Sequence, residues 1–109
     1  LKMDILQEKI TALPENEQNI CFFDKHMDKS NMRYAFNLLV EKCSGLCGCF
    51  DGDDENGYRY VMGGRDVDVI AAGKAMNEAL DGRGGGSKEM FQGSLKAARE
   101  QIEKYFANL

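Results

Sequence analysis

The stretch GLCGCFDGDDENGYRYVMG, residues 45–63, decides the fold because it predicts a β-hairpin in the middle of the chain. Two apolar runs, GLCGCF and YRYVMG, flank the segment DGDDENG at residues 51–57. Glycine, asparagine and aspartate tolerate the left-handed backbone that a tight chain reversal needs. We therefore expect two antiparallel strands joined by an acidic tip.

The acidic tip has part of the spacing of a calcium-binding loop. Asp51, Asp53 and Glu55 stand at positions i, i+2 and i+4. The sixth position is Asn56 and the twelfth is Met62, where a calcium loop of the EF-hand type needs glycine and glutamate. We expect a solvated hairpin tip rather than a calcium site.

Working outward, the flanking segments predict alternating helices and strands. Helices are predicted over about residues 3–13, 30–43, 66–80 and 95–108, and short strands over 19–23 and 89–92. The expected N-caps are Ser30, Asp66 or Asp68, and Ser94. The order α-β-α-β-β-α-β-α predicts an α/β fold, a small single domain with a mixed β-sheet of about four to five strands flanked by helices.

The first predicted helix has a narrow apolar stripe that Pro14 ends. The stripe consists of Met3, Leu6, Ile10 and Leu13. A helix with so little apolar surface cannot bury itself, so it needs either a partner helix or the body of the domain.

Length and composition limit the class of protein. The 109 residues suit one compact domain. We expect no membrane association, because the sequence has neither a long apolar run nor a signal peptide. The reduced thiols that we expect at its cysteines suit a cytoplasmic protein. A helical pattern that begins at once, at Leu1, predicts a fragment of a longer chain. The net charge of −4 argues against a generally basic nucleic-acid-binding protein, although residues 82–109 carry five basic and three acidic residues.

Side chains suited to catalysis or metal binding are scarce. The single histidine, His26, is expected to be exposed and inactive. With one histidine and no cysteine–histidine pair at ligand spacing, we expect no catalytic zinc site. Tyr58 and Tyr60 share one strand face and could stack on bases, but ordinary strand tyrosines explain them better. Buried, reduced thiols rather than zinc ligands are expected at Cys21, Cys43, Cys47 and Cys49.

The stretch DGRGGGSKEMFQGS, residues 81–94, is the strongest candidate for a binding site. Glycines allow a backbone to approach a ligand closely, and successive backbone N–H groups can bind an anion. Arg83 and Lys88 bracket the glycines and could contact phosphate. The alternative is a plain connection between a helix and a strand. A Walker motif is excluded because the sequence lacks G-K-[ST] here.

The same stretch, between a helix carrying KAMNEAL and a terminal helix, resembles the DHHA1 domain. This module ends alanyl-tRNA synthetases and the long alanyl-tRNA editing proteins, and it also occurs in DHH-family phosphoesterases. The form N-x-x-L-x-G-R-G-G-G-S, residues 77–87, is similar to the editing proteins. Ser87 stands where the phosphoesterases usually have a histidine. The resemblance covers residues 19–109, and residues 1–13 would be the end of a linker helix.

The resemblance implies an accessory domain that binds tRNA(Ala) and in some members dimerises. It implies no catalytic residue, no metal and no cofactor within this chain. Hydrolysis of mischarged tRNA(Ala) would belong to an upstream zinc-containing editing domain. The resemblance implies that Gly82, Arg83, Gly84, Gly85, Gly86, Gln92 and Gly93 form the functional surface. Charge and position add Ser87, Lys88, Lys96 and Arg99.

Two other functions fit the same sequence. The domain could dimerise its parent protein through the N-terminal stripe or through a sheet edge. It could instead help a DHH-family phosphoesterase to hold its substrate. The parent itself could be an aminoacyl-tRNA hydrolase or an alanine–tRNA ligase.

Overall fold

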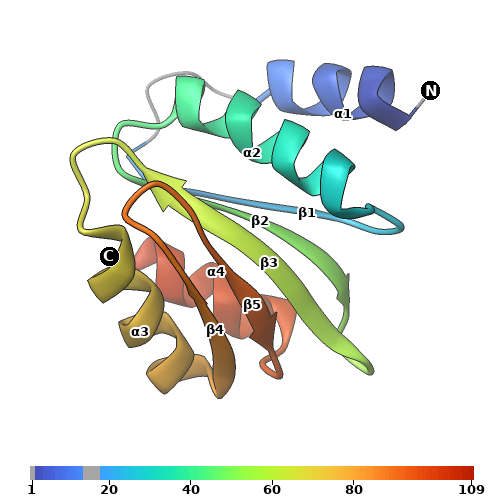
Figure 1. Cartoon of the computed structure of the whole chain (residues 1–109). Helices are drawn as coiled ribbons and strands as arrows, with labels where there is room; N and C mark the ends of the chain where they lie inside the picture. Colours follow the sequence, from blue (N-terminus) through green and yellow to red (C-terminus); the bar gives the residue numbers. More distant parts are fainter. Residues whose placement is uncertain (1, 14–17) are drawn as a thin grey trace.

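A computed structural model, which describes residues 2–13 and 18–109, shows helices on both faces of one mixed sheet (Figure 1). The helices are α1 (Lys2–Thr11), α2 (Lys29–Lys42), α3 (Val69–Leu80) and α4 (Arg99–Ala107). The strands are β1 (Ile20–Asp24), β2 (Leu46–Asp53), β3 (Gly57–Gly64), β4 (Gly82–Gly86) and β5 (Phe91–Leu95). None of the described helices is long and apolar enough to cross a membrane.

The sheet has five strands in the order β1-β2-β3-β5-β4. β1 runs parallel to β2, and every other neighbouring pair is antiparallel. The hairpin predicted from residues 45–63 is therefore confirmed as β2 and β3. The predicted α/β class with a mixed sheet is also confirmed, with the element order α-β-α-β-β-α-β-β-α.

The extra strand is β4, the glycine-rich segment that was expected to be a loop. Gly82–Gly86 pairs with Phe91–Leu95 along its whole length and forms one edge of the sheet. Glycine has no side chain to show the alternation that marks a strand in a sequence. The pairing with β5 and the packing beneath it hold the strand in place instead.

The last helix also begins later than expected. Ser94 lies inside β5 rather than capping a helix, and α4 starts at Arg99. Leu95 is the buried last residue of β5, so its apolar side chain completes the sheet side of the core. The Ala98 N–H donates a hydrogen bond to Gln101 Oε1 at 2.9 Å at the start of α4.

Two of the other helix starts have aspartate caps. Asp68 caps α3, as one of the two predicted alternatives, and its carboxylate accepts a hydrogen bond from the Ala71 N–H at 3.1 Å. Asp28 rather than Ser30 caps α2, accepting from the Asn31 N–H at 2.8 Å. Both carboxylates satisfy backbone donors that the first helical turn leaves free.

The sheet separates two apolar layers, one on each face. On one face, α1 and α2 cover the side chains of β1, β2 and β3 that point toward them, including Phe22, Cys49 and Val61. On the other face, α3 and α4 pack on side chains that include Phe50, Tyr60 and Phe91. Figure 1 shows α1 and α2 together on one side of the sheet and α3 and α4 on the other.

The N-terminal stripe packs within the domain. Leu6 and Ile10 are buried in the layer beneath α1 and α2, and Leu13 is partly buried against it. Met3 stays 40% exposed. The stripe thus uses the body of the domain as its partner. Pro14, which was expected to end this helix, lies outside the described residues.

Candidate functional site

The glycines of β4 are explained on one side by close packing. A Cβ added at Gly82 or Gly84 would point to the α3 side of the sheet. At Gly82 it would lie 2.7 Å from Asn77 Oδ1, and at Gly84 it would lie 2.7 Å from the Tyr60 hydroxyl. A Cβ at Gly86 would lie 2.8 Å from Phe91 Cα. These distances are shorter than real Cβ contacts, so larger residues would displace the strand.

Gly85 differs from the other glycines of the strand. A Cβ there would meet nothing within 4 Å. Positive φ is confined, among the described glycines, to Gly52 and Gly57. Neither packing nor backbone conformation therefore requires glycine at position 85. Gly85 has no positive φ, so a valine at this position would not strain the backbone.

The strand register places Gly85 within an open area of the α2 side of the sheet. Arg59, Ser94 and Arg83 form one row across β3, β5 and β4. The next row on the same face consists of Val61, Gln92 and Gly85. Because α2 packs over β2 and β3, the side chains on the β5 and β4 part of these rows remain exposed.

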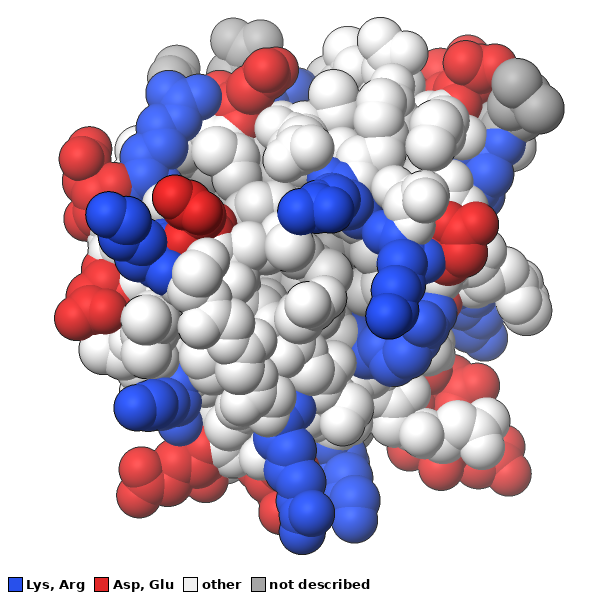
Figure 2. Space-filling model, in the orientation of Figure 1, with Lys and Arg blue, Asp and Glu red and all other residues white. Residues whose placement is uncertain are grey.

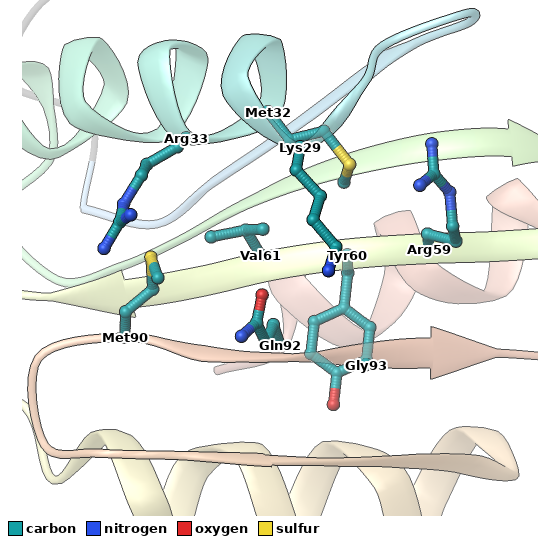
Figure 3. A pocket seen from close by; sticks show the side chains of 9 residues that line it. All are labelled: Lys29, Met32, Arg33, Arg59, Tyr60, Val61, Met90, Gln92 and Gly93. Carbon is teal, nitrogen blue, oxygen red and sulfur yellow. The ribbon is translucent and has the colours of Figure 1, made fainter.

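A cavity of about 390 Å³ lies where this open area meets α2. Lys29, Met32 and Arg33 form the α2 wall, β3 contributes residues 59–61, and Met90, Gln92 and Gly93 form the opposite side (Figure 3). In this view, the side chains of Lys29 and Arg33 both extend from α2 toward β5. No acidic side chain is among the described residues that line the cavity.

The turn between β4 and β5 closes one end of the cavity. A Cβ at Gly63 would lie 2.7 Å from Phe36 Cζ and 2.9 Å from the Glu89 carbonyl oxygen. Glycine at position 63 therefore lets the turn pass close to β3 and α2. The Ser87 N–H donates to the Met90 carbonyl at 2.9 Å and fixes the turn.

The three basic residues of the cavity differ in how they are held. Arg59 is bound by the carboxylate of Asp51 and donates a hydrogen bond to the Met27 carbonyl at 2.6 Å. Asp51 is a buried carboxylate, so much of the charge of Arg59 is neutralised locally. Lys29 and Arg33 are exposed and form no hydrogen bond or ion pair with any residue that the structure describes.

The charge distribution on this side of the molecule agrees with that arrangement. In Figure 2, basic side chains border the uncharged centre of the face, and acidic side chains lie mostly toward its margins. The net charge of −4 is therefore an average over unlike surfaces. A negatively charged ligand would meet attraction here despite the overall charge.

The structure divides the predicted site residues into three groups, of which two belong to the glycine-rich edge of the sheet. Arg83, Gly85, Gln92 and Gly93 share the open area with the cavity, and the exposed turn residues Ser87 and Lys88 lie at its end. Gly82, Gly84 and Gly86 support this strand from the α3 side.

Lys96 and Arg99 lie elsewhere. Lys96 borders a hollow with Asp81 and Gln101, next to the ends of α3 and α4. The Arg99 guanidinium lies 4.4 Å from the centre of the Phe23 ring and 3.6 Å from the Glu103 carboxylate. Phe23 belongs to the apolar layer of the α3 and α4 face, so Arg99 does not join the cavity.

This surface also contains four residues that were not predicted from the sequence to belong to it: Lys29, Arg33, Arg59 and Ser94. They come from α2, β3 and the outward-facing positions of β5, and only the strand register brings them together. The spacing of Lys29 and Arg33 was a usable signal, because residues four apart share one side of a helix.

Thiols and metal ligands form no second site. Among residues 2–13 and 18–109, no group of three or more His, Cys, Asp or Glu side chains could hold a metal ion. The free cysteines are buried or half-buried, as expected. Burial raises the pKa of the Cys21 thiol to about 11 and that of Cys49 to about 12, and it also raises the pKa of Cys47. Thiols so poorly ionised are unsuited to nucleophilic chemistry at neutral pH.

Tyr60 is part of the support and not of the exposed surface. Its ring is 1% exposed, and its hydroxyl donates to Asn77 Oδ1 at 2.7 Å. Burial raises the pKa of Tyr60. Tyr58 is also buried, so the reading of both residues as strand tyrosines agrees with the structure.

The fold resembles a domain of known structure. The C-Ala domain of alanyl-tRNA synthetase from Aquifex aeolicus superimposes with a TM-score of 0.65 and 14% sequence identity. The match covers 87% of this chain and 94% of that domain. No protein-family model matches the sequence, and no curated protein matches it. At this identity the likeness establishes a common fold.

Proposed function

We propose that this chain is a DHHA1-type accessory domain that binds tRNA(Ala) for an alanyl-tRNA editing protein or an alanyl-tRNA synthetase. The proposal rests on the open half of the sheet, where a glycine-rich strand lies beside basic residues. The cavity next to it has no acidic side chain among the described residues that line it. The C-Ala-like fold supports the proposal, because that domain belongs to an enzyme that acts on tRNA for alanine. Hydrolysis of mischarged tRNA would be the work of a zinc-containing domain upstream.

The expected mode of binding is backbone contact rather than base recognition. Arg83 is exposed on β4 and can form paired hydrogen bonds with a phosphate. Gly85 leaves room for the ligand to approach the strand closely. With about 2–4 phosphate contacts, the chain alone would bind weakly at physiological salt, and linkage to a catalytic domain would raise the effective concentration.

The test is fluorescence anisotropy of labelled tRNA(Ala) with the chain at several salt concentrations. The logarithm of the association constant should fall with the logarithm of salt, with a slope of roughly −0.7 to −0.9 per phosphate contacted. Arg83→Gln should weaken binding and reduce that slope by about 1. Lys74→Gln, an exposed position on α3, is the matched control. No binding even at low salt would refute the proposed function.

Dimerisation is a second candidate, and one feature favours it. β4 is an edge strand whose residues 83–86 are exposed, and unpaired edges can join a strand from another chain. The molar mass in solution, measured by light scattering, distinguishes the two. A dimer that Arg83→Gln leaves unchanged and that does not bind tRNA would favour the dimerisation role.

A further inference from the structure

We infer that Lys29 and Arg33 of α2 form a phosphate clamp with Gln92 of β5, which extends the binding surface beyond the glycine-rich strand to α2. The ligand class is a phosphate ester. The inference rests on the proposed function for one point: if the chain binds tRNA, the phosphate belongs to the RNA backbone. The arrangement of the three side chains does not depend on that function.

The two cations of the clamp lie on the same side of α2. Lys29 and Arg33 are four residues apart in α2, so their side chains leave the helix on the same side. Both line the cavity of about 390 Å³ and extend across it toward β5 (Figure 3). Gln92 faces them from the opposite wall and offers an amide donor.

Both cations of the clamp lack an ion-pair partner among the described residues. The nearest acidic neighbour in sequence, Asp28, uses a carboxylate oxygen to accept the Asn31 N–H. Arg59 is the contrasting case, since Asp51 already binds it. Two unpaired cations facing one cavity attract an anion.

The two cations also differ in how they would bind a phosphate. Arginine presents a planar fork suited to two oxygens of a phosphate, whereas lysine contributes a point charge on a flexible stem. The cavity volume falls in the range of pockets for small molecules. It therefore suits one nucleotide unit, with the phosphate against α2 and the sugar toward the open sheet.

The test compares the double variant Lys29→Gln/Arg33→Gln with the control Lys74→Gln in the salt-dependent tRNA binding experiment. The double variant should raise the dissociation constant by about tenfold or more and reduce the salt slope by about 1, because the two cations hold one phosphate. The single variant Arg33→Lys should retain more affinity than the double variant. Lysine keeps the positive charge of arginine but cannot donate two parallel hydrogen bonds to a phosphate. Both substituted residues are exposed, so the melting temperature should not change.

A second measurement separates this inference from the proposed function. Inorganic phosphate and adenosine monophosphate are titrated into the isotope-labelled chain while the side-chain amide signal of Gln92 is followed by NMR. Shifts that the double variant abolishes would support the clamp even if tRNA does not bind, and would assign a free phosphate ester as the ligand. If tRNA binds and the double variant behaves like Lys74→Gln, the clamp is refuted and the proposed function survives. If neither phosphate nor tRNA has an effect, both fail.

Discussion

The Tyr60 hydroxyl donates its hydrogen bond to Asn77 Oδ1 at 2.7 Å and so joins β3 to α3 beneath the glycine-rich edge of the sheet. A Cβ at Gly84 would lie 2.7 Å from the same hydroxyl. The bond and the absence of a side chain at position 84 are therefore two parts of one arrangement. The ring of Tyr60 fills the space that side chains on β4 would otherwise occupy.

Tyr60→Phe should lower the free energy of unfolding by about 1–2 kcal/mol, because it removes one hydrogen bond and leaves Asn77 Oδ1 without its donor. Chemical denaturation followed by circular dichroism measures the change. Tyr34→Phe is the control, since no described residue is hydrogen-bonded to the Tyr34 hydroxyl. Equal stability of the two variants would mean that the Asn77 contact contributes nothing.

Gly84→Ala and Gly85→Ala should differ sharply although they are adjacent. At position 84 the added methyl group would clash with the Gln92 carbonyl and the Tyr60 hydroxyl, so we expect a loss of about 1–3 kcal/mol. At position 85 the methyl group meets nothing within 4 Å, and the loss of chain entropy in the unfolded state should stabilise by up to about 1 kcal/mol. Similar unfolding midpoints would contradict the described pairing of β4.

Gly85→Val should keep the fold but weaken tRNA binding. The position is open and has no positive φ, so the larger side chain fits the strand while it blocks close approach from outside. The melting temperature and the anisotropy titration together test this expectation. If both stay at the wild-type values, the ligand does not approach the sheet at this residue.

Asp68→Ala should destabilise the chain by about 1 kcal/mol, because it removes the side-chain acceptor for the Ala71 N–H at the start of α3. Asp66→Asn is the control, since Asp66 has φ 48° and asparagine tolerates that conformation. A larger effect at Asp66 than at Asp68 would show that the cap has been assigned to the wrong aspartate.

The stability of the chain should fall as pH rises above about 8.5, the ordinary pKa of a free thiol. Burial raises the pKa of Cys21 to about 11 and that of Cys49 to about 12. The folded state therefore keeps protons that the unfolded chain releases, and this stabilisation is complete below pH 8.5 and is lost toward the folded-state pKa values. Denaturation at pH 7.0 to 9.5 measures the slope, which should be smaller in Cys21→Ala. A flat profile would contradict the burial of these thiols.

Much of the fold was predictable because its strands alternate and its turns have characteristic residues. The hairpin of β2 and β3 was predicted correctly for this reason. β4 was not, since glycines carry no periodicity. The error at α4 arose because Leu95 continues the helical spacing of Ala98 and Ile102, although it is buried in β5, outside the helix. The structures of these two segments are set by contacts with residues that are distant in the chain.

The residues of the candidate site were also predicted only in part. Arg83, Gly85 and Gln92 were named because they lie in one short motif. Lys29 and Arg33 are at least 50 residues earlier, and only the packing of α2 beside β3 brings them to the same cavity. Local patterns indicate one wall of a surface, whereas the opposite wall requires the tertiary structure.

The contrast between Gly84 and Gly85 has a consequence for how the sequence can diverge. Substitutions at position 84 are removed by folding itself, in any descendant of this domain and whatever it binds. At position 85 folding exerts no such selection, so other residues can replace this glycine unless binding of a ligand requires it. A lineage that has lost the binding role should therefore lose the second glycine of the run while it keeps the first.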